Sequence, residues 1–503
     1  MSAPHAFGTR TGSGELCARV LRLCDTAEPL LPPGPAADSV AAVRQRLGER
    51  TLRVAVGGRM NAGKSTLVNA LLGRRLAATA ATECTMLVAW FRRGVQNRIE
   101  VRRTDGRTYH VRGAPGGGIP ADPTLLGSPR EEIEEIAVEV TDSLGADDYT
   151  LVDTPGMDTL SGLDEVAMRA LAQADALLYV MPHPGAGDEE ALQALRMKAG
   201  ARMTALNVVG VLSRIDELGS GEGDPWPRAR RVAATYTRRL TGMVTEVVPV
   251  AGLLAQTALG DEFTEQDTLL VRRLATDRAA LERALYSPDD FLCWETGPLS
   301  AEQRQRAFAL LGRYGIATAV AAVAEGATST RSLLDELRRA CGIDPLLAHM
   351  KRRFIDAADR LRAAAALTAL DAVASAAAAG AGQALTTPAR AALDELRAGI
   401  AGVRRHPLMR QQDLAAALSD LAGGRLVLPE PDSAALVALA TGATTQSCLA
   451  LAPGAAPTAV AAAAAEQAAY WRRLEFTAPS RPVQRHARTA RELCEAFLFE
   501  AWH

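Results

Sequence analysis

An eight-residue segment, residues 58–65 (GRMNAGKS), constrains the fold of this 503-residue chain more than any other feature. It follows a short apolar run with β-branched residues and precedes a helical pattern, and it matches the phosphate-loop motif G-x-x-x-x-G-K-[ST]. Gly58 and Gly63 let backbone N–H groups close around phosphate oxygens, and the following helix directs the positive end of its dipole toward them. The segment therefore predicts a strand, a loop that binds a nucleoside triphosphate, and a helix.

Lys64 and Ser65 supply the charge and the metal contact in this motif. Lysine is scarce in the chain, since it occurs only at Lys64, Lys198 and Lys351. An ammonium group at position 64 reaches the β- and γ-phosphate oxygens, and the hydroxyl of Ser65 is placed to ligate Mg²⁺.

Strand-like and helical runs alternate from this motif to about residue 255. We predict strands at 51–56, 88–91, 98–103, 109–112, 136–140, 150–152, 176–181, 208–212 and 247–250, and helices at 64–72, 164–172, 188–199 and 228–240. Such alternation predicts a mostly parallel sheet covered by helices on both faces. Asp105-Gly106 is expected to join two of the strands as an antiparallel hairpin.

Two further segments follow predicted strands and bear on the nucleotide. Asp153-Thr-Pro-Gly156 ends the run YTLVD, where a carboxylate can hold a metal through water and the N–H of Gly156 can sense a γ-phosphate. Ser213-Arg214-Ile-Asp216 ends the run VVGVL. The Asp216 carboxylate can accept hydrogen bonds from N1–H and the amine of guanine, whereas adenine presents an acceptor at N1. GTPases usually carry Lys two residues before this Asp, and the stem and planar head of Arg214 can lie over the base instead.

Two other predicted contacts complete the nucleotide site. Val250-Ala251-Gly252, after the run EVVPV, is placed to back the base with main chain. A threonine that closes over the γ-phosphate is expected between the phosphate loop and the next strand, where Thr79, Thr82 and Thr85 all lie, and we choose Thr85 because it directly precedes the strand.

After residue 257 the strand patterns end and Ala-rich helical patterns take over. Ser300-x-x-Gln303 has the form of a capping box, and Gly342 is expected to close one helix before Asp344-Pro345 opens the next. We predict N-terminal helices at 1–49 that pack with a helical bundle, a GTPase domain at 50–257 and an elongated Ala-rich α-helical bundle at 258–503. The window 363–382 is too rich in Ala to favour a spanning helix, whereas the amphipathic segment 406–431 is a candidate lipid-contacting tip.

Composition narrows the class of protein. Lys+Arg 56 against Asp+Glu 58 gives a net charge of -2, which argues against a protein that mainly coats nucleic acid. The seven cysteines show no metal-like cluster and are predicted to be buried thiols in a reducing cytoplasm. The N-terminus shows no apolar run of a signal peptide.

Five segments together resemble the bacterial dynamin-like GTPases, and in particular their actinobacterial branch of isoniazid-inducible proteins. These segments are GRMNAGKSTLVNALLG, ATECTMLVAW, LVDTPGMDTL, VLSRIDELG and VVPVAGLLA. LLGRYGIATAV (310–320) is similar to what that branch carries next. The resemblance implies a large cytoplasmic GTPase that associates with itself or a sister protein through the nucleotide face. It also implies a helical part that docks on lipid at the inner membrane face, with hydrolysis coupled to membrane remodelling.

Two positions depart from relatives in ways that bear on hydrolysis, one in the phosphate loop and one directly after Gly156. Eukaryotic dynamins carry Gln where this chain has Met60, and small Ras-like GTPases carry Gln where it has Met157, and neither thioether can orient water. Asn61 resembles the Asn that ligates a monovalent cation in potassium-activated GTPases. We therefore predict that Asn61 helps to hold K⁺ or Na⁺ when two GTPase domains meet; the alternative is that it only caps the loop.

The complete prediction comprises GTP or GDP, Mg²⁺ and three sets of residues. The residues expected to contact the nucleotide are Gly58, Asn61, Ala62, Gly63, Lys64, Ser65, Thr66, Ser213, Arg214, Asp216, Ala251 and Gly252. Those expected near the metal are Ser65, Thr85 and Asp153, and those expected to act in hydrolysis are Lys64, Ser65, Thr85, Gly156 and Asn61. Two alternatives remain open, an Era-type GTPase that serves RNA or ribosomes and a GTP-binding scaffold with negligible turnover.

Overall fold

The structure is a computed structural model of the chain. It describes residues 14–49, 51–78, 87–114, 116–120, 122–141, 148–156, 163–199, 203–218, 223–379, 386–422 and 424–502.

The described strands form one nine-stranded sheet. They are β1 (Leu52–Gly58), β2 (Val88–Arg93), β3 (Arg98–Arg103), β4 (Thr108–Val111), β5 (Ile133–Val140), β6 (Tyr149–Asp153), β7 (Ala176–Met181), β8 (Val208–Leu212) and β9 (Val247–Pro249). Their order is β4-β3-β5-β2-β6-β1-β7-β8-β9, and the run from β6 to β9 is parallel throughout. β3 and β4 form the predicted antiparallel hairpin. The predicted fold class, a mostly parallel α/β sheet followed by a long helical region, is confirmed.

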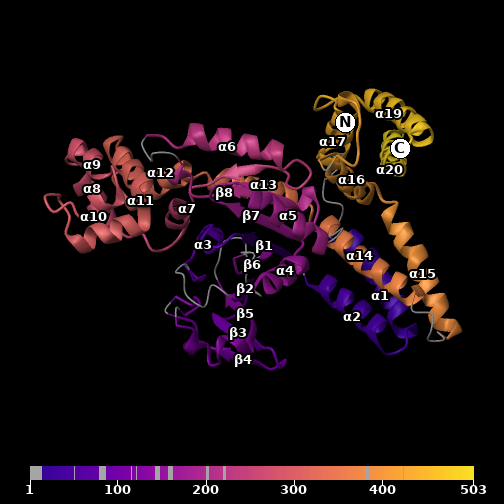
Figure 1. Cartoon of the computed structure of the whole chain (residues 1–503), viewed down its shortest axis with the longest axis horizontal. Helices are drawn as coiled ribbons and strands as arrows, with labels where there is room; N and C mark the ends of the chain where they lie inside the picture. Colours follow the sequence, from indigo (N-terminus) through magenta and orange to yellow (C-terminus); the bar gives the residue numbers. More distant parts are fainter. Residues whose placement is uncertain are drawn as a thin grey trace.

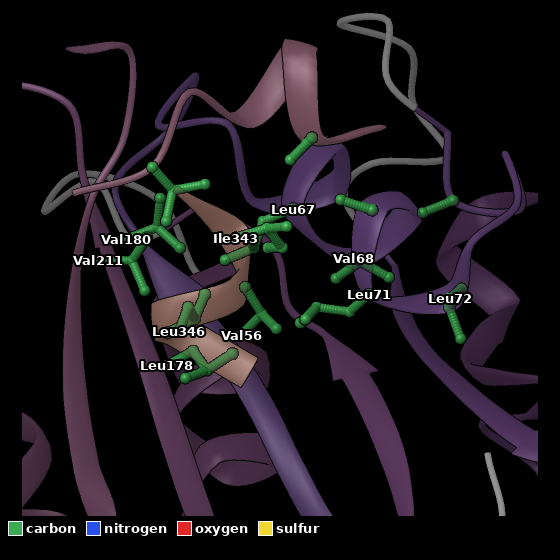
Figure 2. Close-up of a cluster of buried hydrophobic side chains, with 14 of the residues drawn as sticks. Val56, Leu67, Val68, Leu71, Leu72, Leu178, Val180, Val211, Ile343 and Leu346 are labelled. Carbon is green, nitrogen blue, oxygen red and sulfur yellow. The ribbon is translucent and has the colours of Figure 1, made fainter. Parts of the chain in front are cut away.

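Helices cover both faces of this sheet. Those that follow its strands are α3 (Lys64–Leu72), α4 (Leu163–Gln173), α5 (Ala186–Ala199), α6 (Trp226–Arg239) and α7 (Gly252–Leu259). Successive residues of a strand point to opposite faces. Val56 of β1 lies in one cluster with Leu67 and Val68 of α3 (Figure 2), whereas a Cβ at neighbouring Gly57 would lie 3.2 Å from Leu171 of α4.

A second group of helices extends the core of the sheet. It consists of α8 (Glu265–Leu274), α9 (Arg278–Ala284), α10 (Pro288–Leu292), α11 (Ala301–Ala324), α12 (Thr330–Cys341) and α13 (Ile343–Met350). Ile343 and Leu346 of α13 are fully buried and lie beside Val56 and Leu178 on the sheet (Figure 2). The hydrophobic core that begins at Leu52 therefore continues through these helices.

The remaining helices form two separate clusters on the side of the sheet away from α8–α12 (Figure 1). In the first, α1 (Glu15–Ala27) and α2 (Pro35–Gly48) pack against α14 (Ala358–Ala379) and α15 (Thr387–Arg404). The second contains α16 (Pro407–Ala422), α17 (Glu430–Thr441), α18 (Thr445–Cys448), α19 (Pro457–Thr477) and α20 (Arg481–Trp502) around the buried Trp471. Ala205 and Leu206 of a short helix, η6 (Ala205–Asn207), join this cluster, so it also contacts the sheet-containing part.

Burial corrects the predicted lipid-contacting tip. Leu414 and Leu418, on the apolar face of segment 406–431, are buried in the cluster around Trp471, and Met409 is buried in the cluster that α1 and α2 form with α14 and α15. An amphipathic helix has the same pattern whether its apolar face meets lipid or protein, and here it meets protein.

Two other features of the described residues bear on predictions about the membrane and the cysteines. One helix, α11, is long and apolar enough to be a candidate membrane span, with a mean hydropathy of 1.6, but half of that window is buried inside the protein, as in the core helix of a soluble domain. The prediction that every cysteine is buried is wrong at Cys293, which is exposed on the surface after α10.

Candidate nucleotide-binding site

Three residues of the phosphate loop have backbone conformations that favour glycine or asparagine. Gly58, Asn61 and Gly63 have φ angles of 146°, 58° and 90°. A Cβ at Gly58 would lie 2.3 Å from the carbonyl oxygen of Val180 on the adjacent strand β7, so this position admits glycine alone. Left-handed residues interspersed in a loop turn successive N–H groups toward one point, which is the arrangement of an anion-binding nest.

The loop leads directly into α3, whose first residues carry the polar groups of the motif. The ammonium of Lys64 is buried and donates to the carbonyl oxygen of Arg59 at 2.9 Å, which folds the side chain back over the loop. The hydroxyl of Ser65 donates to Oδ2 of Asp153 at 2.8 Å. Asp153 ends β6, which pairs with β1, so the sheet itself aligns the two segments.

Asp153 has a buried carboxylate, and only one of its two oxygens receives a hydrogen bond from a described residue. Its Oδ1 atom has no hydrogen-bond partner among the described residues, and the residue is only 8% exposed. Burial raises its pKa to about 6, against the opposing effects of the Ser65 hydroxyl and the Lys64 charge. A buried carboxylate oxygen without a partner beside a phosphate loop is suited to a hydrated divalent cation.

The segment after Asp153 lies against the phosphate loop. The hydroxyl of Thr154 donates to the carbonyl oxygen of Val56 at 2.9 Å, which fixes the segment to β1. A Cβ at Gly156 would lie 2.7 Å from Cα of Met60, so the backbones approach too closely for any other residue. Gly156 therefore lies beside the loop, as the predicted role of its N–H requires.

The predicted base-recognition segment also contacts the phosphate loop. The hydroxyl of Ser213, at the end of β8, donates to the carbonyl oxygen of Ala62 at 2.7 Å. Arg214 has a φ of 50° and forms an ion pair with Glu217 at 2.9 Å. Burial raises the pKa of Asp216, and the charges of Arg214 and Arg313 act in the opposite direction.

The third predicted segment, Ala251-Gly252, lies at the start of α7. A Cβ at Gly252 would lie 3.8 Å from the methyl carbon of Thr66 in the first turn of α3, so this segment too is adjacent to the phosphate loop. The N–H of Ala251 donates to the carbonyl oxygen of Cys341 at the end of α12, at 2.9 Å. The amide expected to face a base is thus engaged by a helix from the second half of the chain.

The structure therefore gathers the predicted residues at one edge of the sheet, where β1, β6, β8 and β9 end. The carboxyl ends of parallel strands are where open α/β sheets bind their ligands. Thr85 and Met157 lie outside the described residues.

Sequence reasoning missed the contacts that α11 and α12 make with this edge. The indole N–H of Trp226, just after the base-recognition segment, donates to the hydroxyl of Tyr314 at 2.9 Å and to the carbonyl oxygen of Ala340 at 3.2 Å. Gly312 of α11 lies next to Asp216. The available signal was the LLGRYG segment, whose two glycines are unfavourable within a helix.

No group of three or more His, Cys, Asp or Glu side chains is arranged to hold a metal ion in the part of the chain that the structure describes. A cation at the phosphate loop would therefore take most of its ligands from phosphate oxygens and water, as Mg²⁺ does in nucleotide sites.

Comparison with known proteins agrees with this arrangement. A sequence model of the dynamin family matches residues 54–215. Isoniazid-induced protein IniC of Mycobacterium tuberculosis is 35% identical over 343 residues, which cover 65% of this chain and 68% of that protein. Dynamin-like protein A of Bacillus subtilis is 28% identical over 191 residues, which cover 37% of this chain and 16% of that protein.

Among solved structures, an oligomerised bacterial dynamin pair aligns with 77% of this chain and 78% of its own, at 13% identity and a TM-score of 0.31. This low score carries no weight in the assignment, which rests on the sequence relatives and on the family match. The chain belongs to the dynamin family, among the bacterial dynamin-like proteins that include the isoniazid-induced protein IniC.

Proposed function

We propose that the chain binds GTP and hydrolyses it to GDP and phosphate at the edge of the sheet where the phosphate loop lies. The observation that carries this proposal is the pairing of Ser65 with the buried Asp153 beside that loop. Family membership, the nest of left-handed residues and the position of Asp216 just after β8 support it.

The residues present fit Mg²⁺. Ser65 offers a hydroxyl at the start of α3, and Asp153 offers an oxygen that no described residue engages. When bound, Mg²⁺ supplies neutralisation of the charge on the phosphate oxygens. Lys64 binds the β- and γ-phosphates, Gly156 donates its N–H to the γ-phosphate, and Thr85 closes over the metal in this proposal.

Base selection is assigned to three residues in two segments. Asp216 accepts from N1–H and the amine of guanine, Arg214 lies over the base, and Gly252 backs it with main chain. The contacts of Ser213 with Ala62 and of Gly252 with Thr66 support this assignment, because they set these segments beside the phosphate loop.

We further propose that Asn61 helps to hold K⁺ or Na⁺ at the phosphates when two nucleotide faces meet. Asn61 has a φ of 58° and is exposed in the phosphate loop, next to Met60, which is 45% exposed. Because Met60 cannot orient water, we expect slow hydrolysis that self-association accelerates.

The proposed cellular role is that of a cytoplasmic, peripherally bound protein at the inner membrane face, where association with itself or a sister protein is coupled to membrane remodelling. Its support is membership of the dynamin family together with helical clusters that extend away from the sheet (Figure 1). We expect no nucleic acid partner, because the chain has a net charge of -2.

The division of the chain into 1–49, 50–257 and 258–503 remains a prediction. The continuous core from Leu52 to Leu361 favours a GTPase unit that also includes α8–α13. The packing of α1 and α2 on α14 and α15 favours the predicted association of the N-terminal helices with the helical part.

Binding and coupling are tested together by sedimentation of the chain with anionic liposomes in GTP, in GDP and without nucleotide. We expect co-sedimentation that depends on the nucleotide state, and Lys64→Ala is the matched control that removes this dependence. Calorimetry that finds equal heats for GTP and ATP, or none for GTP, contradicts the proposed base selection.

One observation favours a second candidate, a GTP-binding scaffold with negligible turnover. Met60 is apolar at the position where dynamins carry Gln. Single-turnover hydrolysis measured at low and high protein concentration separates the two, because only the GTPase accelerates on self-association.

A further inference from the structure

Helix α11 bends sharply at Gly312. This buried residue has φ 59° and ψ -175°, a combination open essentially to glycine alone. A break of this kind frees carbonyl groups from the helical hydrogen-bond pattern. The carbonyl oxygen of Leu310 instead accepts from the hydroxyl of Thr257 on α7, the helix that begins at Gly252.

The bend faces Asp216. A Cβ at Gly312 would lie 3.9 Å from Oδ2 of Asp216 and 3.5 Å from Cδ2 of Leu253. The next residue, Arg313, donates to the carbonyl oxygen of Tyr286 at 2.8 Å. Asp216, Arg313 and Tyr314 all line one cavity of about 900 Å³, whose other lining residues follow β8 or belong to α6, α9, α11 and α12 or lie next to these helices.

Helices α11 and α12 also bond to segments that come after Asp216 in the chain. The carbonyl oxygen of Cys341 at the end of α12 accepts the N–H of Ala251, and Tyr314 accepts the indole N–H of Trp226, the first residue of α6. Tyr314 in turn donates to the carbonyl oxygen of Ala340 at 3.2 Å. Of the two segments expected to meet the base, one is therefore bonded to α12 through Ala251, and the other lies beside the bend of α11 at Asp216.

We propose that Gly312 is a positioning residue for guanine recognition: the bend that it permits in α11 sets the Asp216 carboxylate at the base. This inference rests on the proposed role of Asp216 in binding guanine. The contacts of the bend described above are with Asp216, Leu253 and Thr257 and not with the phosphate loop, so we expect base binding to depend on α11 more strongly than phosphate binding does.

The test compares a ligand that has a base with one that does not. Gly312→Ala, in the 503-residue chain, forces the backbone out of its bend, because alanine does not tolerate this conformation. We expect its affinity for GDP to fall about 10-fold or more. Its affinity for inorganic triphosphate, which uses the phosphate loop alone, stays within about 2-fold of the unmodified chain.

A matched control is Gly326→Ala. Gly326 follows the end of α11 with a φ of 104°, and a Cβ there would meet nothing within 4 Å. The substitution places alanine at another positive-φ position, just after the end of the same helix and outside the bend beside Asp216, and is expected to change neither affinity. Both are measured by isothermal titration calorimetry, with the melting temperature of the ligand-free chain recorded alongside.

The following results would overturn either the positioning role of Gly312 or the proposed function. Unchanged GDP affinity in Gly312→Ala, or equal losses for GDP and triphosphate, overturns the positioning role. If Gly312→Ala does not fold, Thr257→Val decides in its place, since it removes the hydrogen bond to Leu310 without adding a Cβ at the bend, and an unchanged GDP affinity overturns the role. An unmodified chain that binds ADP as tightly as GDP overturns the proposed function itself.

Discussion

The hydroxyl of Ser65 and the carboxylate of Asp153 lie 2.8 Å apart, although 88 positions separate them in the chain. Asp153 ends β6, which pairs in parallel with β1, the strand before the phosphate loop, and Val56 lies opposite Asp153, so the phosphate loop and the end of β6 are held at a fixed spacing. The contact between Ser65 and Asp153 joins two of the four segments from which the proposed GTPase site is built.

Removing either the Ser65 hydroxyl or the Asp153 carboxylate is expected to slow Mg²⁺-dependent hydrolysis strongly. Asp153→Asn and Ser65→Ala each lose a group near the metal, so we expect turnover to fall on the order of 100-fold. Phosphate release at saturating GTP and varied Mg²⁺ measures it. Ser39→Ala, which removes a hydroxyl that bonds within α2, is the control, and full activity in either site variant contradicts the proposed metal contacts.

Asp216→Asn is expected to change the preferred base. The amide accepts only one of the two guanine N–H groups but can donate to the 2-oxo group of xanthine, so GDP affinity should fall about 100-fold while XDP affinity rises. Asp224→Asn, which alters another carboxylate lining the same cavity, serves as the control. Competition binding with GDP, XDP and ADP measures the preference, and an unchanged order of the three contradicts the role of Asp216.

Asn61→Gly tests the monovalent cation without backbone strain, since glycine tolerates the φ of 58°. We expect the unmodified chain to hydrolyse GTP faster in KCl or NaCl than in the chloride of a large organic cation. In the variant this salt dependence should disappear. Equal rates of the unmodified chain in all three salts would contradict the hypothesis and leave the loop-capping alternative.

Stability of the cluster around Trp471 is expected to fall in mild acid because of His486. This histidine is 4% exposed, and burial lowers its pKa below 6.5 despite the opposing hydrogen bond with Asp420 at 2.8 Å. The unfolded chain therefore takes up the proton at higher pH than the folded chain does. The stabilisation is complete above pH 6.5 and is lost as the pH falls from there toward the lowered pKa.

Urea denaturation at pH 7.5 and pH 5.5 measures this effect, with His486→Gln expected to show a smaller difference between the two values. Asp420 does not interfere in this window. Its pKa is lowered, since hydrogen bonds from His486 and Arg425 outweigh its burial, so its own contribution is lost only at more acidic pH. An identical pH difference in the variant would assign the effect to other groups.

Arg362→Met is expected to loosen the junction between the helices and the sheet. One guanidinium nitrogen of Arg362 donates to the carbonyl oxygens of Arg46, Leu47 and Glu49, directly before β1. We expect the free energy of unfolding to fall by about 1–3 kcal/mol, because the buried carbonyls lose a charged donor. Arg404→Met, which removes a surface ion pair with Asp371, should change it by less than about 0.5 kcal/mol in the same urea titration.

Local patterns predicted the elements and the site but not the partners of the later helices. β3 coincides with its predicted range, α3 begins and ends where its pattern does, and the capping box at Ser300 and Gln303 is present. These features depend on residues close in sequence. The contacts of Ser65 with Asp153 and of Ser213 with Ala62 also agree with the motifs, because parallel strands bring their ends together.

Long-range packing accounts for what the sequence did not predict. The periodicity of 343–350 identifies a helix and its apolar face, yet nothing local shows that Ile343 and Leu346 cover the sheet beside α3. The same limit applies to α16, whose apolar face was expected to meet lipid. The bend at Gly312 was visible only as an unfavourable residue in a helical pattern, and its neighbour Asp216 is 96 positions earlier in the chain.

The chain enters the sheet after Glu49 and leaves the core of the sheet near Leu361, and Arg362 joins these two crossings by its hydrogen bonds to the segment before β1. The cluster around Trp471 is attached to the sheet-containing part at a second place, because Gln412 of α16 donates to Thr204 at 3.3 Å and Leu206 is buried in that cluster. Any rotation of this cluster relative to the sheet would therefore have to break the contacts at Thr204 and Leu206 first.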